Sequence, residues 1–315
     1  MGTAMLGSLE SGFIFALMAL GVYLTFRILD FPDLTVDGSF TTGGSVAAVL
    51  IVSGYPPLIA TALAVVAGFF FGAITGVLHT KGKINALLSG ILSMIALYSI
   101  NLRIMGKANI GLLGQETLIS QISAWTGSMK YSILIVVAIL AIIVKVALDW
   151  FLRTEIGMAL RATGDNPRMI RSFSANTDNT IIIGLALSNG LVALSGALMA
   201  QYQGFSDVSM GIGMIIIGLA SVIIGEAIFG SRSIWRATFA VVGGAVIYRL
   251  VVAAALRFKF VEASDMKLIT ALIVIAALIA PKMINNMKEK KRKAARRKQM
   301  IKANASLGGE KNAEA

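Results

Sequence analysis

The stretch FPDLTVDGSFTTGG, residues 31–44, decides how this sequence is interpreted, because it interrupts an otherwise apolar chain. Pro32 has no backbone amide to donate and disfavours helix in the residue before it. Gly38, Gly43 and Gly44 weaken a helix further, since glycine loses more conformational freedom on folding than any other residue. We therefore expect a break in the second apolar segment.

Two carboxylates, Asp33 and Asp37, stand beside this expected break. Carboxylates suit a helix N-terminus, where free amides and the positive end of the helix dipole favour negative charge. Non-helical backbone inside a bilayer is tolerated only where protein or a watery cavity satisfies its polar groups. The stretch is either a discontinuous helix that lines a solute path or a cytoplasmic loop in which Asp33 or Asp37 caps a helix. The residues alone leave both interpretations open.

Apolar segments surround the break on both sides. Of 315 residues, 57% are hydrophobic and only 14% are charged, and the mean hydropathy is +0.81. Soluble domains carry roughly a quarter charged residues, so we expect an all-α polytopic membrane protein with about eight to ten transmembrane helices, each needing about 20 apolar residues. The candidate spans are residues 9–29, 36–53, 58–78, 84–105, 131–148, 181–202, 210–229, 234–256 and 267–283. Residues 203–229 are short and glycine-rich, so a re-entrant segment there would change the count by one.

Positive charge is concentrated at the end of the chain. The last 34 residues hold eleven Lys/Arg and three Asp/Glu, which gives +8 of the net charge of +12. By the positive-inside rule, a basic tail of residues 287–315 lies in the cytoplasm after a transmembrane domain of residues 1–286. The tail is also suited to contact anionic membrane lipid. No nucleic acid is needed to explain it.

Several kinds of chemistry are excluded by composition and motif. The chain has no cysteine, so disulfides, thiolate metal sites and thiol catalysis are absent, and its single histidine, His79, cannot form a polyhistidine metal site. The sequence contains no G-x-x-x-x-G-K-[ST] phosphate loop, no H-E-x-x-H and no G-x-S-x-G motif. We therefore expect neither an enzyme nor a cofactor.

A long polar segment, residues 153–180, falls between the fifth and sixth spans. Pro167 marks a natural helix start after the turn Gly164–Pro167, and Arg168–Phe173 can form a short amphipathic helix. Its apolar residues Met169, Ile170 and Phe173 share one side. Such a helix is covered either by a partner protein, which we favour, or by the ends of the chain's own spans.

Ionisable residues inside spans are costly, and each needs an explanation. Lys145 and Asp149 are spaced to pair along one helix face. Glu226 lies near the cytoplasmic interface and is interpreted as structural. Glycines at every fourth position from Gly68 to Gly76 predict close approach of a neighbouring helix.

Several segments together resemble the permeases of branched-chain-amino-acid-type ABC importers. They are residues 12–48, which include FPDLTVDGSFTTGGSVAA, and then IGMALRATGDNPRMIRSFSANTDN, SGALMAQYQGFSDVSMGIG and GLASVIIGEAIFG. Their shared order covers most of the chain. DLTVDGSF and LYSINLRIMG (residues 97–106) look like the subgroup associated with tryptophan or tyrosine uptake, many members of which have no assigned substrate.

The resemblance implies a permease subunit in a bacterial inner membrane, with the fold of vitamin-B12-type and branched-chain-amino-acid-type importers. It implies two copies of an ABC ATPase subunit, an extracytoplasmic substrate-binding protein and a second copy of this chain. It would place Asp37, Ser39 and Thr41 near the substrate path. Tyr98 and Asn101 are added to the path from their polarity and the subgroup resemblance, and Asn189 from its polarity within a span. The coupling helix would place Met169, Ile170 and Phe173 in the ATPase, with Arg161, Asp165 and Arg168 around them. Ser174–Asn176 stands where the family often has glycine, so the end of that helix is open.

Two other classes of protein remain possible. A secondary transporter would use Asp37 to couple transport to an ion gradient. A structural membrane scaffold would tolerate changes throughout residues 33–41.

Overall fold

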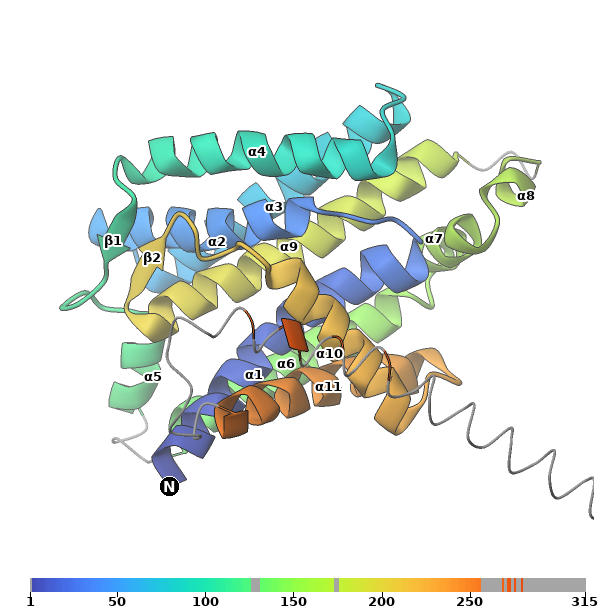
Figure 1. The fold of residues 1–315 in the computed structure, drawn as a ribbon. Helices are drawn as coiled ribbons and strands as arrows, with labels where there is room; N and C mark the ends of the chain where they lie inside the picture. Colours follow the sequence, from blue (N-terminus) through green and yellow to red (C-terminus); the bar gives the residue numbers. More distant parts are fainter. Residues whose placement is uncertain are drawn as a thin grey trace, which may run out of the picture.

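The structure, a computed structural model, describes residues 2–125, 131–172 and 176–255, together with the single positions 268, 271, 272, 275 and 279. This part of the chain is a bundle of helices with one two-stranded sheet (Figure 1). Its elements are α1 (Gly2–Val22), the π-helical turn η1 (Tyr23–Ile28), α2 (Thr35–Val52), α3 (Pro57–Thr80), α4 (Ala86–Met105), β1 (Asn109–Gly111), α5 (Leu118–Trp125), α6 (Ser132–Phe151), α7 (Glu155–Asp165), α8 (Pro167–Ser172), α9 (Thr177–Gln203), β2 (Phe205–Asp207), α10 (Met214–Phe229) and α11 (Ile234–Ala255).

Seven helices in the described part are long and apolar enough to cross a membrane. They are α1 with η1, α2, α3, α4, α6, α9 and α11, and they match seven of the predicted spans. The eighth, α10, is apolar but has only 16 residues. This short helix explains why residues 203–229 gave an ambiguous prediction. The expected span 267–283 and the basic tail 287–315 lie outside the described residues, apart from the single positions named above.

The helices run back and forth between two ends of the bundle (Figure 1). One end carries α7 and α8, and the other carries the N-terminus, α5 and the sheet. Strands β1 and β2 pair antiparallel with Ile110 opposite Ser206. The short basic loop after α3 (residues 79–83) and the polar segment 153–180, as far as the structure describes it, lie at the α7–α8 end. Helices α1, α2 and α9 form the buried centre of the bundle.

The predicted break is real, but it precedes the second helix instead of interrupting it. Residues 29–34 are not helical, and Asp33 reaches the side chain of Asn189, halfway along α9. Helix α2 therefore begins part-way across the bundle. It then runs without interruption through Gly38, Gly43 and Gly44.

These three glycines permit close packing. A Cβ on Gly38 would lie 2.7 Å from the Leu97 side chain of α4, and one on Gly44 would lie 2.8 Å from the Met210 sulfur. A Cβ on Gly43 would overlap the Ala193 carbonyl of α9. The expectation that the glycines break the helix is wrong, because burial on three sides outweighs their weak helix propensity.

The glycine stripe on α3 also behaves as a packing surface, as predicted. A Cβ on Gly68 would lie 2.5 Å from the Asn189 carbonyl oxygen, and one on Gly76 would lie 2.8 Å from the Ile182 Cα. Helix α9 can approach α3 this closely only because both positions lack a side chain.

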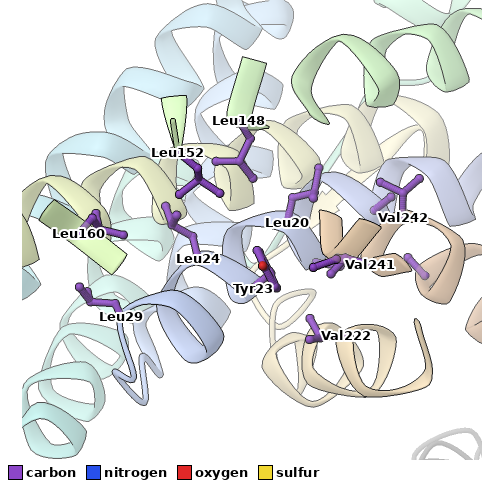
Figure 2. Close-up of a cluster of buried hydrophobic side chains, with 14 of the residues drawn as sticks. Leu20, Tyr23, Leu24, Leu29, Leu148, Leu152, Leu160, Val222, Val241 and Val242 are labelled. Atoms are coloured by element: carbon purple, nitrogen blue, oxygen red, sulfur yellow. The ribbon is translucent and has the colours of Figure 1, made fainter. Parts of the chain in front are cut away.

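A cluster of buried apolar side chains lies where α1, α6, α7, α10 and α11 meet (Figure 2). Leu20, Leu24, Leu152 and Leu160 are fully buried within it. Leu160 packs α7 against the transmembrane helices. The first half of the polar segment 153–180 is therefore held against the bundle.

Two ion pairs lie near this cluster. The Lys145 ammonium lies 2.6 Å from the Asp149 carboxylate, which confirms the predicted pair. Arg27 of η1 lies 3.0 Å from Glu226 of α10. Glu226 thus holds two elements together, in agreement with its structural interpretation.

Candidate functional site

A cavity of about 420 Å³ lies between α2, α4 and the turn that precedes α10. It is mostly apolar, with a few polar groups, which is the usual character of a small-molecule site. Its lining residues are Asp37, Gly38, Thr41, Met94, Ile95, Tyr98, Ser99, Asn101, Val208 and Ile212. Four of the six predicted path residues, Asp37, Thr41, Tyr98 and Asn101, are therefore brought to one site.

Asp37 connects α2 to α10. Its two carboxylate oxygens accept hydrogen bonds from the backbone amides of Gly213 and Ile215, each at 2.8 Å. These amides open α10, where a helix has unpaired donors and the positive end of its dipole. Gly213 has φ +87°, a left-handed conformation that favours glycine.

The preceding turn lies directly on α2. A Cβ on Gly211 would overlap the Asp37 carbonyl oxygen. The start of α10 is thereby fixed against α2, and the wall of the cavity made by Val208 and Ile212 is fixed with it.

Asn101 and Tyr98 present different chemistry on the α4 side. The Asn101 side-chain nitrogen donates to the Gly38 carbonyl oxygen at 3.2 Å, but its side-chain oxygen is buried and accepts no hydrogen bond from any described residue. Such an orphan acceptor suits a ligand that carries N–H or O–H groups. Tyr98 is half exposed and offers an aromatic ring beside it.

The other two predicted path residues lie elsewhere. Ser39 is fully buried, and its hydroxyl has no partner among the described residues. Asn189 is fully buried between α3 and α9, where its amide nitrogen donates to Asp33 at 2.7 Å. Neither residue lines the cavity. Ser39 lies on the opposite side of the unbroken α2 from Asp37 and Thr41, and Asn189 belongs to α9.

Asp33 has a role that the sequence only partly revealed. One carboxylate oxygen accepts the Thr35 amide at 2.9 Å, and the other accepts the Asn189 side chain. It therefore satisfies the first turn of α2 at the point where the non-helical segment ends. The sequence signal for this capping role was the position of Asp33 beside the expected break, two residues before Thr35.

The predicted coupling segment forms two helices. Asn166 separates them, and its side chain accepts the Met169 amide at 3.1 Å. Gly164 and Asp165, expected in a turn, belong instead to α7, because Gly164 packs against the backbone of Ile28.

The residues of this segment divide between the two helices. Arg161 on α7 is half-buried, whereas Asp165 and Arg168 are exposed. Met169 on α8 is 55% exposed, and Ile170 is half-buried. Phe173 lies outside the described residues. Helix α8 lies at the edge of the bundle (Figure 1), and its Met169 side chain is exposed there.

Sequence reasoning did not identify the apolar walls of the cavity. Met94, Ile95, Val208 and Ile212 look like ordinary membrane residues, and only the spatial meeting of α4 with the turn before α10 reveals their location. The backbone donor of Gly213 was equally invisible, since it depends on a helix start.

These features define a multi-pass membrane permease. Residues 4–279 match the family model described as "Branched-chain amino acid transport system / permease component", and the chain belongs to that family.

Curated relatives agree with this assignment. The chain is 45% identical, over 84% of its length and 87% of the relative's, to a tyrosine transport system permease protein of Clostridioides difficile. It is 27% identical to a probable branched-chain amino acid transport permease protein of Methanocaldococcus jannaschii, over 89% of this chain and 91% of that protein. It is 25% identical to a ribose import permease protein of Escherichia coli, over 67% and 65%. No solved structure matches the chain.

Proposed function

We propose that this chain is the permease subunit of an ATP-driven importer of amino acids, and that aromatic amino acids are its preferred substrates. The observation that carries the proposal is the cavity between α2, α4 and the turn before α10, which combines an apolar wall, a tyrosine ring and an amide oxygen that accepts no hydrogen bond from the described residues. The identity to a tyrosine transport permease supports the substrate class.

The chemistry of the cavity fits an aromatic amino acid. The Tyr98 ring and the side chains of Met94 and Ile95 suit an aromatic side chain. The Asn101 oxygen suits the α-ammonium group, which has three donors. Asp37 already binds two amides, so its charge acts mainly through the field in the cavity.

Energy for transport comes from a separate ABC ATPase in this proposal. Two ATPase copies dock on α8 of two permease copies, with Met169 and Ile170 inserted and Asp165 and Arg168 at the edge. In this proposal Phe173, which lies outside the described residues, also contacts the ATPase, and Arg161 of α7 supports the contact. Closure of the ATPases then rocks the permeases between outward and inward openings.

The surroundings of the permease follow from the same proposal. The α7–α8 end faces the cytoplasm of a bacterial cell. The basic tail 287–315 lies on the same side and contacts the membrane lipid there. Residues 1–286 form the transmembrane domain. An extracytoplasmic binding protein delivers substrate to the end that carries α5 and the sheet. The permease is a homodimer.

An ion-coupled secondary transporter is the second candidate, because Asp37 is a carboxylate within a span. Its two oxygens are occupied by the Gly213 and Ile215 amides, so a coupling ion would have to compete with both hydrogen bonds. The importer proposal needs no such competition.

One experiment separates the two candidates. The tagged chain is purified from its native membrane in mild detergent, its companions are identified by mass spectrometry, and the preparation is reconstituted in vesicles. The importer predicts a co-purified ABC ATPase and uptake of tyrosine or tryptophan that requires ATP and binding protein. Uptake by the chain alone, driven by an ion gradient, would instead favour the secondary transporter.

A further inference from the structure

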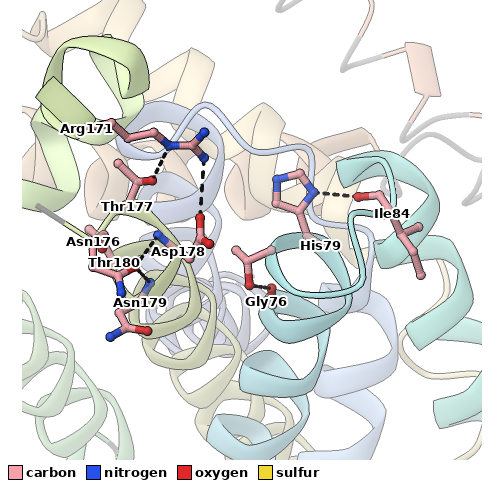
Figure 3. Close-up of polar contacts among 10 residues, drawn as sticks. Gly76, His79, Ile84, Arg171, Asn176, Thr177, Asp178, Asn179 and Thr180 are labelled. Carbon is pink, nitrogen blue, oxygen red and sulfur yellow. Dashed lines mark hydrogen bonds and ion pairs between the residues drawn. The ribbon is translucent and has the colours of Figure 1, made fainter. Parts of the chain in front are cut away.

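A second hollow, of about 600 Å³, lies at the α7–α8 end of the bundle and has no part in the substrate cavity. We call it the basic cleft. It separates the end of α3 and the loop 81–85 from the junction of α8 and α9, and Figure 3 shows His79 and Ile84 on one side with Arg171 and Asp178 on the other. Its lining residues are His79, Thr80, Lys83, Ile84, Asn85, Arg171, Asn176, Thr177, Asp178 and Ile181.

Most side chains of the cleft already have partners. The Arg171 guanidinium donates to Thr177 at 2.9 Å and lies 3.5 Å from the Asp178 carboxylate. The His79 Nδ1 lies 2.8 Å from the Ile84 carbonyl oxygen, and since a carbonyl only accepts, this nitrogen donates. The one carboxylate that lines the cleft is thus already paired with Arg171.

Lys83 is the exception. Its side chain is exposed and makes no ion pair or hydrogen bond with any residue that the structure describes, although its backbone has φ +53°. A left-handed conformation costs a residue with a Cβ roughly 1–2 kcal/mol. Gly82, next to it, could adopt this conformation without that cost. Strain at a residue with an unpaired charge is a reason to look for function at that residue.

The charges of the cleft sum to a positive value. Lys83 and Arg171 outweigh Asp178. The first turns of α4 and α9 add their positive ends, although the side chains of Asn85 and Asn176 already cap them. An anionic group that enters the cleft would therefore find Lys83 as a cation that no described residue pairs.

The position of the cleft indicates where such a group comes from. Arg171, in one wall, belongs to α8, and the exposed Met169 lies on the same short helix. A protein docked on α8 would border the cleft directly.

We propose that the basic cleft is a second contact with the ATPase subunit and receives an acidic side chain of that subunit through Lys83. This inference rests on the proposed function. It adds a charged contact, which sets orientation and encounter rate, to the apolar contact at α8.

The test compares two lysines of one loop. Lys81 is exposed but does not line the cleft, so Lys81→Glu is the matched control for Lys83→Glu. Each permease is purified with its ATPase in detergent that contains only neutral phosphatidylcholine, at several salt concentrations. We expect Lys83→Glu to retain about tenfold less ATPase, as loss of a paired interface charge does, and Lys81→Glu to behave as wild type. Lys83→Gln, which removes the charge without reversing it, should lower ATPase retention by a smaller factor. This graded response checks that misfolding is not the cause of the loss.

A labelling measurement gives independent support. Because the chain has no cysteine, Lys83→Cys and Lys81→Cys each carry a single thiol. Bound ATPase should slow modification of the first several-fold and leave the second unchanged.

The outcomes separate this inference from the proposed function. If Lys83→Glu keeps its ATPase while Met169→Asp combined with Ile170→Asp removes it, the cleft contact is wrong and the importer proposal stands. If the effect of Lys83→Glu appears only when phosphatidylglycerol is added, the cleft binds a lipid headgroup and the inference is overturned. If the wild type retains no ATPase, both proposals fail.

Discussion

The carboxylate of Asp37 faces the substrate cavity and holds the start of α10 at the same time. A substitution at this residue therefore affects the shape of the cavity as well as its charge. Ser39, two residues on, is buried, its hydroxyl has no partner among the described residues, and it does not line the cavity. The two positions make a useful pair, because both were predicted to line the substrate path.

Replacing Asp37 with Asn should reduce transport strongly. One of the two α10 amides would lose its acceptor, since the Asn side chain offers one oxygen only, and an unmet buried donor costs about 1–3 kcal/mol. We expect a matching loss of stability in thermal unfolding and, if the full cost appears in transport, uptake in vesicles that is about five- to hundredfold slower, from the free-energy relation of 1.4 kcal/mol per factor of ten. Ser39→Ala should leave uptake unchanged. Wild-type uptake by Asp37→Asn would contradict the role given to this residue.

Gly196 tests the close packing of α9 on α2. A Cβ at this position would overlap the Phe40 carbonyl oxygen. Gly196→Ala should destabilise the permease by about 1–3 kcal/mol, the usual cost of overpacking, measured as a lower unfolding temperature in detergent. Gly111→Ala serves as the control because its Cβ would meet nothing within 4 Å. Equal stability of the two variants would refute the packing argument.

At the scale of elements, α8 is the helix that a docked ATPase would contact in the proposed importer. It begins at Pro167 and is anchored through α7, so its exposed residues can be changed without disturbing the core. Changing Met169 and Ile170 together to Asp should abolish ATPase co-purification and leave the gel-filtration profile intact. Leu113→Asp, at a residue 91% exposed at the opposite end, should have no such effect. If the double variant kept its ATPase, the coupling assignment would be wrong.

The sheet at the other end should respond to pH. The Ser209 hydroxyl and amide donate to Asp207 of β2 and hold the pKa of that carboxyl below its ordinary value. Because the pKa of Asp207 is lower in the folded protein, the ionised carboxylate stabilises the fold fully above the ordinary value of about 4. This stabilisation is lost as pH falls through the lower folded pKa. Exchange of the 205–207 amides, corrected for intrinsic rate, should therefore speed up in strong acid. Asp207→Asn should remove this pH dependence of exchange. If the variant kept the same pH dependence, the role given to the Asp207 carboxylate would be refuted.

Much of the element order follows from the sequence, because an apolar run of bilayer length has few alternatives to a helix. The spacing of Gly68, Gly72 and Gly76 predicted a packed face, and Lys145 with Asp149 predicted a pair. The sequence could not show whether Gly38, Gly43 and Gly44 break α2 or pack it, since glycine serves both purposes. That choice depends on neighbours distant in sequence.

The candidate site was predictable in part for the same reason. Asp37, Thr41 and Asn101 are polar residues in apolar surroundings and stand out. Ile95 and Val208 do not, because an apolar cavity wall and a lipid-facing surface use the same residues. Their role depends on how α4 meets the turn before α10.

At the scale of the whole molecule, the chain presents two chemically different ends. Basic loops gather at the α7–α8 end, and the sheet lies at the other (Figure 1). Single cysteines in this cysteine-free chain should distinguish them. In intact cells, a membrane-impermeant maleimide should label Leu113→Cys and not Arg168→Cys, and inverted vesicles should reverse the pattern. Labelling of both residues from one side would contradict the proposed orientation.

The two short strands connect parts of the chain that are nearly a hundred residues apart. Strand β1 continues from α4, and β2 leads into the turn before α10, so each strand is continuous with a different wall of the cavity. A binding protein that pressed on this hydrogen-bonded pair from outside would displace both walls together. The paired strands would then couple the two walls mechanically, so that one docking event at the sheet would change the width of the cavity entrance.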